Sequence, residues 1–460
     1  MPEPTLTDRL AGMSLVAVTV LMALADWTRL PGAADAAAAL CVVVLALLTP
    51  KVRPSRQVFV MIALVLAAIA AMTRGDALGL IDRALQTAAF VAAFFTALTT
   101  LRHAADGSPS IQACGTYLAT QPPGRRYMSL TIGGQLFSLI LNYGAISLLG
   151  SLALAGSRHE VQPEIVAIRT RRMLLAIQRG FVSTLPWSPL AFSTAITTVL
   201  VPGASWTDAL LPCLVSGVIL AALGWALDTV FKPKLPGPRP PPLPPVGHWT
   251  SLRPLVVLLA ILITGVAALH AATQVRVVGI VVVLVPLIAA VWVLQQQGRA
   301  GLRARAASYV SGDLIGYRNE LVLLMMAGFI GTVGAALAVP LVAASGLDLA
   351  AVPAPLLLIG LVWIVPLTGQ LGMNPILSVS ILAPMLPDAA ALGVSPAVIV
   401  TAITSGWALT AASSPFTATT LMVGSFGGVS AKRVGLVWNG AYTLIAGVLL
   451  SAWILVLSIL

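Results

Sequence analysis

Charged side chains are scarce in this chain of 460 residues, of which Asp, Glu, Lys and Arg make up only 9%. A soluble domain carries about a quarter charged residues, so this scarcity excludes one. Hydrophobic residues account for 58% of the chain, and they form continuous runs about as long as a membrane-spanning helix, roughly 20 residues. The strands of a membrane barrel would instead alternate apolar and polar residues. The composition therefore predicts an all-α polytopic membrane protein.

Cysteine and histidine are also rare, with three and four residues. Cys41, Cys114 and Cys213 are scattered, without the spacing of a metal site or a redox motif. The sequence shows no nucleophile–base pair and no phosphate-binding loop. We therefore predict that the protein is not an enzyme, and that it holds no cofactor and no resident metal.

The net charge of +11 comes from Lys and Arg that cluster between the apolar runs. Such clusters are typical of the cytoplasmic loops of a membrane protein, so no nucleic-acid partner is predicted. If all the clusters are cytoplasmic, the N-terminus is cytoplasmic and the C-terminus lies outside. The first apolar run ends without a small-residue cleavage pattern. We expect an integral protein of a bacterial inner (plasma) membrane, in contact with the lipid bilayer.

Two stretches 226 residues apart repeat one another: GFVSTLPWSPLAFST at 180–194 and GWALTAASSPFTATT at 406–420. Aligned without a gap, they pair Gly180 with Gly406, Thr184 with Thr410, Ser188 with Ser414, Pro189 with Pro415 and Thr194 with Thr420. Hydrophobic segments interrupted by Gly or Pro at corresponding places of two halves indicate the binding site of a secondary transporter.

This duplication and the loop charges together predict an inverted-topology repeat. About eleven transmembrane helices are expected, with two re-entrant hairpins and two broken helices. The predicted parts are an extra N-terminal helix at 1–30, a first repeat at 31–231, a Pro-rich cytoplasmic linker at 232–252 and a second repeat at 253–460. The first repeat contains a hairpin at 127–156 and a broken helix at 172–202. The second repeat contains a hairpin at 353–387 and a broken helix at 396–425.

Each Ser-Pro pair of the duplication predicts the start of a new half-helix. Serine is a favoured N-cap residue, and proline is favoured at the first helical position. A half-helix that starts inside the membrane directs free N–H groups and the positive end of its dipole at an anion. The free carbonyls of the preceding half-helix can hold a cation. The alternative is an ordinary proline kink.

The predicted hairpins also share a pattern, since Gly134-Gln135-Leu136 matches Gly369-Gln370-Leu371 and an asparagine follows each. Asn142-Tyr143-Gly144 is a turn sequence, and Asn374-Pro375 reads as an N-cap followed by proline. Asparagine at a hairpin tip can bind a cation or an anion, although it can also serve only as a cap. The predicted substrate- and ion-binding residues are Asn142, Gly144, Gly180, Thr184, Ser188, Pro189, Asn374, Pro375, Gly406, Thr410, Ser413, Ser414, Pro415 and Thr417.

Arg179 is the one charged residue within the hairpins and interrupted segments, apart from their basic ends. Charges inside a membrane mark functional sites by default, so Arg179 is a possible anion contact or gate. The alternative is that it extends to the cytoplasmic surface. The same segments contain no Asp, Glu or His, which favours sodium over protons as the coupling ion, because sodium accepts neutral oxygen ligands.

This pattern of spans, opposed hairpins and broken helices resembles the ion transporter superfamily, and within it the divalent-anion/sodium symporter family of di- and tricarboxylate carriers. That family has Ser-Asn-Thr motifs at its hairpin tips. The equivalents here are Leu141-Asn142-Tyr143 and Met373-Asn374-Pro375, in which the asparagine matches. The resemblance implies a homodimer and an elevator motion of the hairpins and broken helices.

The sequence thus favours a secondary active, elevator-type transporter that carries a small carboxylate-bearing anion by symport with sodium. Within the superfamily, the alternatives are an exporter of an inorganic oxyanion and a proton-coupled carrier. Outside this class, the alternatives are a channel and a membrane protein that binds partners through the Pro-rich linker.

Overall fold

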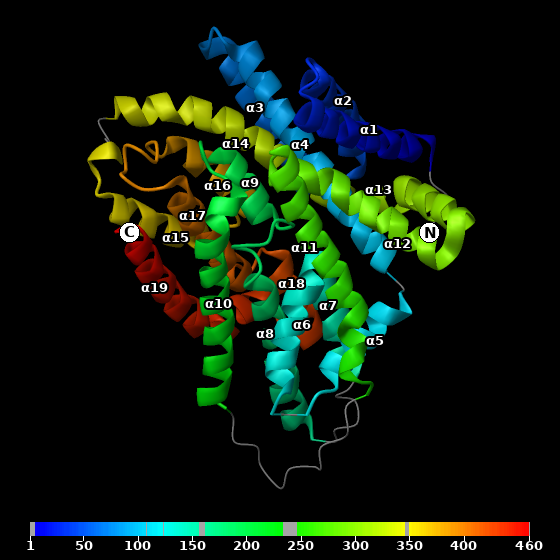
Figure 1. The fold of residues 1–460 in the computed structure, drawn as a ribbon. Helices are drawn as coiled ribbons and strands as arrows, with labels where there is room; N and C mark the ends of the chain where they lie inside the picture. The colour runs from blue at the N-terminus through cyan, green and yellow to red at the C-terminus, as the bar shows by residue number, and fades with distance from the viewer. Residues whose placement is uncertain are drawn as a thin grey trace. The chain divides into compact units, whose positions relative to one another are not determined.

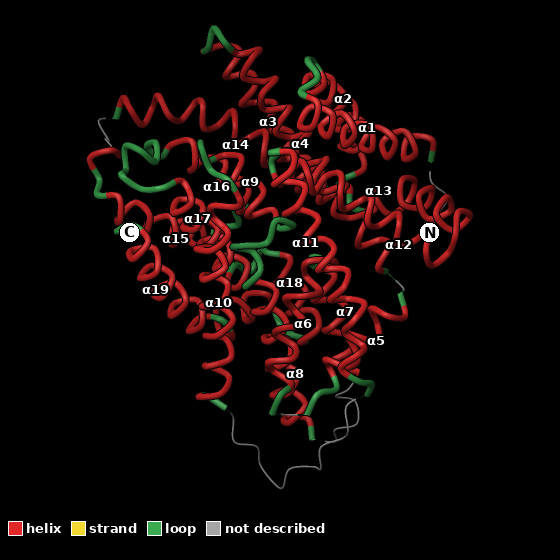
Figure 2. The backbone as a smooth tube through the Cα atoms, viewed as in Figure 1, coloured by secondary structure: helices red, strands yellow, loops and turns green. Residues whose placement is uncertain are grey.

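The computed structural model describes residues 5–106, 108–122, 124–155, 162–232, 246–345 and 349–459. All regular elements in these ranges are helices (Figures 1 and 2). Ten helical runs are long and apolar enough to cross a membrane, which confirms the predicted all-α polytopic class. They are Leu6–Thr28, Ala33–Lys51, Pro54–Thr73, Ala77–Ala105, Trp206–Val230, Trp249–Thr273, Val277–Gly316, Arg318–Val342, Pro396–Gly427 and Gly440–Leu457. Residue 156 of the first predicted hairpin and 233–245 of the predicted linker lie outside the described residues.

The remaining predicted span, at 172–202, is formed by α8 (Pro163–Val182) and α9 (Phe192–Leu200). It is absent from the ten because α8 carries several basic residues and α9 is short. Several short elements were not predicted as such, and two of them matter for unit 2. They are α5 (Pro109–Ala119) and a π-helix, η6 (Arg433–Trp438).

The chain divides into two compact units. Unit 1 comprises Met1–Asp106, Leu262–Leu349 and Ile376–Leu386, and unit 2 comprises Gly107–Ile261, Ala350–Pro375 and Pro387–Leu460. Each unit contains segments from both predicted repeats. The units are defined by packing and the repeats by sequence duplication, so the predicted domain boundaries stay a prediction.

Unit 1 is built around α4 (Ala77–Ala105). This helix packs against α1 (Leu6–Thr28), α2 (Ala33–Leu48), α12 (Val277–Ser308) and α14 (Arg318–Ala344). Its fully buried positions include Ala84, Ala88, Ala93 and Ala97. Small side chains let membrane helices approach closely, where van der Waals contact is the main source of attraction.

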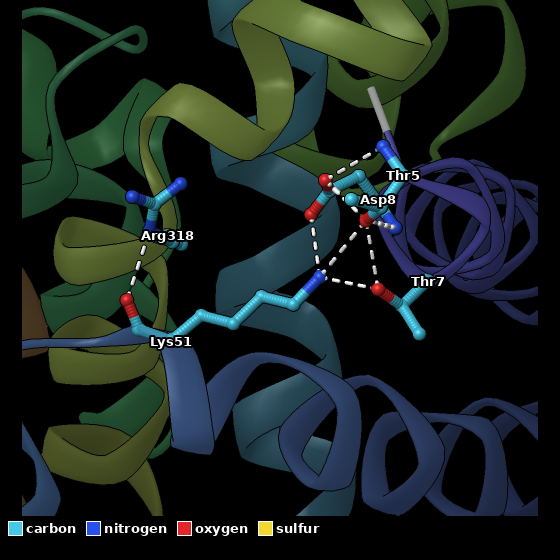
Figure 3. A network of polar contacts seen from close by, with 5 residues as sticks. All are labelled: Thr5, Thr7, Asp8, Lys51 and Arg318. Atoms are coloured by element: carbon cyan, nitrogen blue, oxygen red, sulfur yellow. Dashed lines mark hydrogen bonds and ion pairs between the residues drawn. The ribbon is translucent and has the colours of Figure 1, made fainter. Parts of the chain in front are cut away.

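A polar cluster joins three helix ends of unit 1 (Figure 3). Lys51 Nζ lies 2.7 Å from Asp8 Oδ1 and donates to the hydroxyls of Thr5 and Thr7. Arg318 Nε donates to the Lys51 carbonyl at 3.0 Å. The start of α1, the end of the second apolar run and the start of α14 therefore lie together. The loop charges predict that these three ends share the cytoplasmic side.

A second set of polar contacts joins α1 to the start of α12, and α14 to the end of α3 (Pro54–Thr73). Arg276, before α12, pairs with Asp26 at the end of α1. Arg74, after α3, donates to the carbonyl of Ala336 in α14 at 3.0 Å. The predicted topology assigns each of these pairs to the outer side. The sidedness of these contacts stays a prediction.

In unit 2, α6 (Arg126–Leu141) and α7 (Gly144–Ala155) pack against each other and against α8, as the first predicted hairpin requires. α15 (Ala354–Gln370) packs against α17 (Pro396–Ser413) and α19 (Gly440–Leu457). α10 (Trp206–Val230) packs on α8, α17 and α19. α16 (Pro375–Leu382) lies where the second arm of hairpin 353–387 was predicted, but from Ile376 onward it belongs to unit 1. The pairing of α15 with α16 stays a prediction.

Candidate functional site

Both duplicated stretches contain a helix break, as the sequence predicts. α8 ends at Val182 and the chain resumes a helix at Phe192, the start of α9. α17 ends at Ser413 and α18 (Ala418–Gly427) begins four positions beyond Ser414. The serines of the two breaks are buried, with exposed fractions of 2% for Ser188 and 1% for Ser414. The two serines therefore lie inside unit 2, whereas Phe416 of the second break is exposed at its surface.

The prediction that Ser188 and Ser414 are N-caps is wrong. The N-cap residues are Ala191 for α9 and Thr417 for α18. Each serine instead forms a turn within the break, in which its Oγ accepts the N–H of the residue two positions on, Leu190 or Phe416, at 3.2 Å. This local bond competes with helix formation, so the new half-helix starts later than the Ser-Pro pair suggests.

A second contact also repeats between the breaks. Ser193 donates to the carbonyl of Leu185, and Thr419 donates to the carbonyl of Ala411, which in both cases lies eight residues earlier. A hydroxyl in the first turn of each new half-helix is thus bonded to the end of the preceding segment. The two breaks share geometry as well as sequence.

The starts of the new half-helices have a feature suited to an anion. Neither Ala191 nor Thr417 makes a side-chain capping bond. The Thr417 hydroxyl donates instead to the Ser414 carbonyl at 2.9 Å. The first N–H groups of a helix have no acceptor within it, and the helix dipole makes this end positive. Such an end can hold a carboxylate without any basic residue.

The first hairpin packs directly on the first broken helix. A Cβ placed on Gly180 would lie 2.2 Å from the Thr131 carbonyl oxygen of α6, so only glycine fits at this crossing. Close by, Gln135 Nε2 donates to Ser183 Oγ at 2.9 Å, and Ser138 Oγ lies 3.1 Å from the Thr184 hydroxyl. The hairpin is therefore bonded to the break itself.

The second broken helix has the same arrangement with α15. Gln370 Nε2 donates to Ser413 Oγ at 3.1 Å, and Ser414 Oγ donates to the Gly369 carbonyl at 2.7 Å. A Cβ on Gly406 would lie 2.7 Å from the Leu361 carbonyl oxygen. In both halves, a glutamine that follows glycine donates to a serine of the break. The repeated Gly-Gln-Leu pattern was visible in the sequence, but the partners of its glutamine were not.

The predicted tip residues lie at helix boundaries. Asn142 follows α6 with φ 49° and ψ −127°, and Gly144 begins α7. Asn374 is half-buried and immediately precedes Pro375, the first residue of α16, as the Asn-Pro pair predicts. The structure thus brings Thr184, Ser413 and Ser414 into bonded contact with the first hairpin or with α15. The Thr410 hydroxyl donates within α17, to the Gly406 carbonyl at 2.9 Å, and the two asparagines lie at turns.

Arg179 is buried, with an exposed fraction of 5%. Its Nε donates to Asn439 Oδ1 at 3.1 Å, one terminal nitrogen donates to the Tyr127 hydroxyl at 3.2 Å, and the other to the Trp438 carbonyl at 3.4 Å. The guanidinium also lies 4.5 Å from the centre of the Tyr442 ring. These partners surround the group inside unit 2, which differs from an arginine that extends to the surface.

No protein-family model and no curated protein sequence matches this chain. Among solved structures, the YdaH transporter of Alcanivorax borkumensis is similar, with a TM-score of 0.58, 18% identity, and coverage of 87% of this chain and 98% of that one. MtrF of Neisseria gonorrhoeae, which represents a class of antimetabolite efflux pumps, gives a TM-score of 0.52, 15% identity, and coverage of 87% and 95%.

These likenesses show that the chain has a fold found in polytopic membrane transporters. Both neighbours are transporters by name, and at 18% and 15% identity the likeness concerns the fold. The narrower resemblance to divalent-anion/sodium symporters stays a prediction.

Proposed function

We propose that this protein is a secondary active transporter that moves a small carboxylate-bearing anion together with sodium. The observation that supports it is the pair of helix breaks with buried serines in equivalent turns and with equivalent hydroxyl–carbonyl bonds. In this proposal the anion binds at the starts of α9 and α18, where the half-helix dipoles are positive. Sodium binds to hydroxyl and carbonyl oxygens, with Thr184, Thr410 and Ser413 among the candidates.

The inverted repeat, the homodimer and the elevator motion are part of the same proposal. The repeat is predicted from the duplication and the loop charges, and the homodimer and elevator motion are implied by the resemblance. The likeness to MtrF supports a second candidate in which the protein exports its anion, since MtrF represents antimetabolite efflux pumps. The fold is compatible with either direction, because direction depends on which ion gradient drives the cycle.

Uptake of labelled mono-, di- and tricarboxylates into proteoliposomes, with and without an inward sodium gradient, tests the function. We expect accumulation above the external concentration when the gradient is present, and equilibration at most without it. Accumulation driven by a proton gradient alone would replace sodium by protons. Equilibration under every gradient would indicate a channel. Absence of flux, together with capture of a partner by a peptide of residues 232–245, would indicate an interaction protein.

Removal of the Asn142 side chain is expected to weaken transport more than folding. Asn142→Gly is the clean variant, because glycine tolerates the positive φ of 49° whereas alanine does not. A hydrogen bond to a charged partner is worth about 1.5–3 kcal/mol, so affinity for the transported ion should fall roughly 10- to 100-fold. The dependence of uptake rate on anion and sodium concentration measures this. Asn374→Ala should act in parallel, and wild-type affinities in both variants would remove the tips from the site.

A further inference from the structure

A line of buried side chains connects the last turn of α8 to the last turn of α17. Arg179 donates to Asn439 at 3.1 Å, and Asn439 Nδ2 donates to Gln178 Oε1 at 2.9 Å. Gln178 Nε2 then lies 3.4 Å from the Ala412 carbonyl oxygen and 3.5 Å from that of Ala411. Gln178 and Asn439 have exposed fractions of 0%. The line ends on carbonyls that have no N–H partner within their own helix.

Neutral groups compensate the charge at the head of this line. Arg179 lies in the last turn of α8, where the negative end of the helix dipole favours a cation. The Trp438 carbonyl and the face of the Tyr442 ring add to this. Gly224 of α10 leaves room for the side chain, since a Cβ there would lie 3.1 Å from Arg179 Cδ. The buried Arg179 guanidinium is thus compensated by groups of the protein and needs no carboxylate of the substrate.

We propose that Arg179 is a positioning residue, which acts through Asn439 and Gln178 to fix the carbonyl end of α17 beside the second break. This positioning role rests on the proposed function in one respect: the carbonyl end of α17, which it fixes, belongs to the proposed transport site. A cation that donates to an amide oxygen polarises the amide and strengthens its N–H as a donor to the next group. The bond from Arg179 therefore sets which way the amides of Asn439 and Gln178 point.

The same line couples the two duplicated segments. Gln178 and Arg179 precede the first break, and Ala411 and Ala412 precede the second. Asn439, directly after the π-helix η6, bonds to both Arg179 and Gln178 of α8 and also donates to the Val434 carbonyl at 3.3 Å. Gln178 is the side chain of this line that bridges α8 to α17, and Arg179 and Asn439 set its orientation. A change of geometry at one break can therefore reach the other through this side chain.

Three variants separate positioning from direct contact with the anion. Asn439→Asp keeps the acceptor for Arg179 but removes the donor to Gln178. Gln178→Met keeps the volume but removes both amide bonds. Thr404→Val is the control, because it removes a buried hydroxyl of α17 that bonds only within α17 and to Cys213. Hydrogen exchange of peptides that cover residues 408–417 is measured on the full-length protein in detergent, alongside thermal unfolding and anion uptake.

We expect Asn439→Asp and Gln178→Met each to raise exchange at the end of α17 roughly tenfold, as the loss of a buried hydrogen bond predicts. The double variant should exchange about as fast as either single variant, because both interrupt one line, and Thr404→Val should match the wild type. Arg179→Lys should reproduce the exchange of Asn439→Asp, since lysine lacks the planar fork. Both single variants should also slow uptake to a similar degree.

Unchanged exchange at 408–417 in the two single variants would overturn the proposal, as would additive effects in the double variant. A fall in anion affinity confined to Asn439→Asp, with normal uptake by Gln178→Met, would also overturn it, because it would mean that the new carboxylate neutralises an arginine that binds the anion. If exchange changes as expected while the wild type transports no carboxylate, the positioning role is supported and the proposed function fails.

Discussion

Gly180→Ala is expected to remove most of the folded protein. The new Cβ would lie 2.2 Å from the carbonyl oxygen and 3.0 Å from the carbonyl carbon of Thr131. Both are backbone atoms of α6, so no side chain can rotate away and the hairpin must move off α8. Overpacking of a core costs about 1–3 kcal/mol, and we expect this case at the upper end or beyond. The yield of monodisperse protein in detergent and its thermal midpoint measure the effect.

Gly360→Ala is the matched control in α15. A Cβ at this position would meet no atom within 4 Å, and alanine in a helix is favoured over glycine by about 1 kcal/mol. This variant should therefore fold at least as well as the wild type. Gly134→Ala, whose Cβ would lie 2.6 Å from the Ile177 carbonyl oxygen, should fail like Gly180→Ala. A wild-type midpoint for Gly180→Ala would show that α6 and α8 do not cross at these glycines.

Pro415→Ala is expected to weaken substrate binding strongly while protein yield holds. Ser414 has φ −70° and ψ 128°, the extended conformation that a following proline imposes. Alanine removes this restriction, so α17 can continue through Ser414 and the Ser414–Gly369 bond is lost. The start of α18 then shifts away from the proposed anion position. We expect affinity to fall roughly 10- to 100-fold, the loss of one hydrogen bond to a charged ligand, as measured by the concentration dependence of uptake.

Pro189→Ala should have the smaller effect, although the duplication makes the two prolines equivalent in sequence. α8 already ends at Val182, well before Ser188, whereas α17 runs to Ser413. Pro415 therefore terminates a helix directly and Pro189 does not. Equal losses in the two variants would show that both prolines act on the new half-helix. Wild-type affinity in Pro415→Ala would remove the second break from the site.

Much of the fold could be predicted because it depends on local properties of the sequence. Continuous apolar runs of this length become helices in a bilayer, since a helix satisfies its own backbone polar groups and a barrel strand would alternate apolar and polar residues. A Ser-Pro pair favours a helix boundary locally, because proline restricts the residue before it, so both breaks were predicted within a few residues. Proline alone was no such signal, since Pro212, Pro286 and Pro366 lie inside helices. The Ser-Pro pairs were nevertheless misread as N-caps. The Oγ atoms of Ser188 and Ser414 instead accept the N–H of the residue two positions on. The hydroxyls of Ser193 and Thr419 donate to the carbonyls of residues eight positions earlier.

The sequence by itself determined that this is a helical membrane protein with two equivalent breaks, because hydropathy and turn chemistry act over short distances along the chain. Only the tertiary structure decided the partners of its few polar side chains. Gln135, Gln370 and Arg179 each bond to residues tens to hundreds of positions away. A buried donor takes whichever acceptor packing brings within reach, and packing of the small residues around Gly180 and Gly406 depends on which helices meet. That information is absent from any single segment.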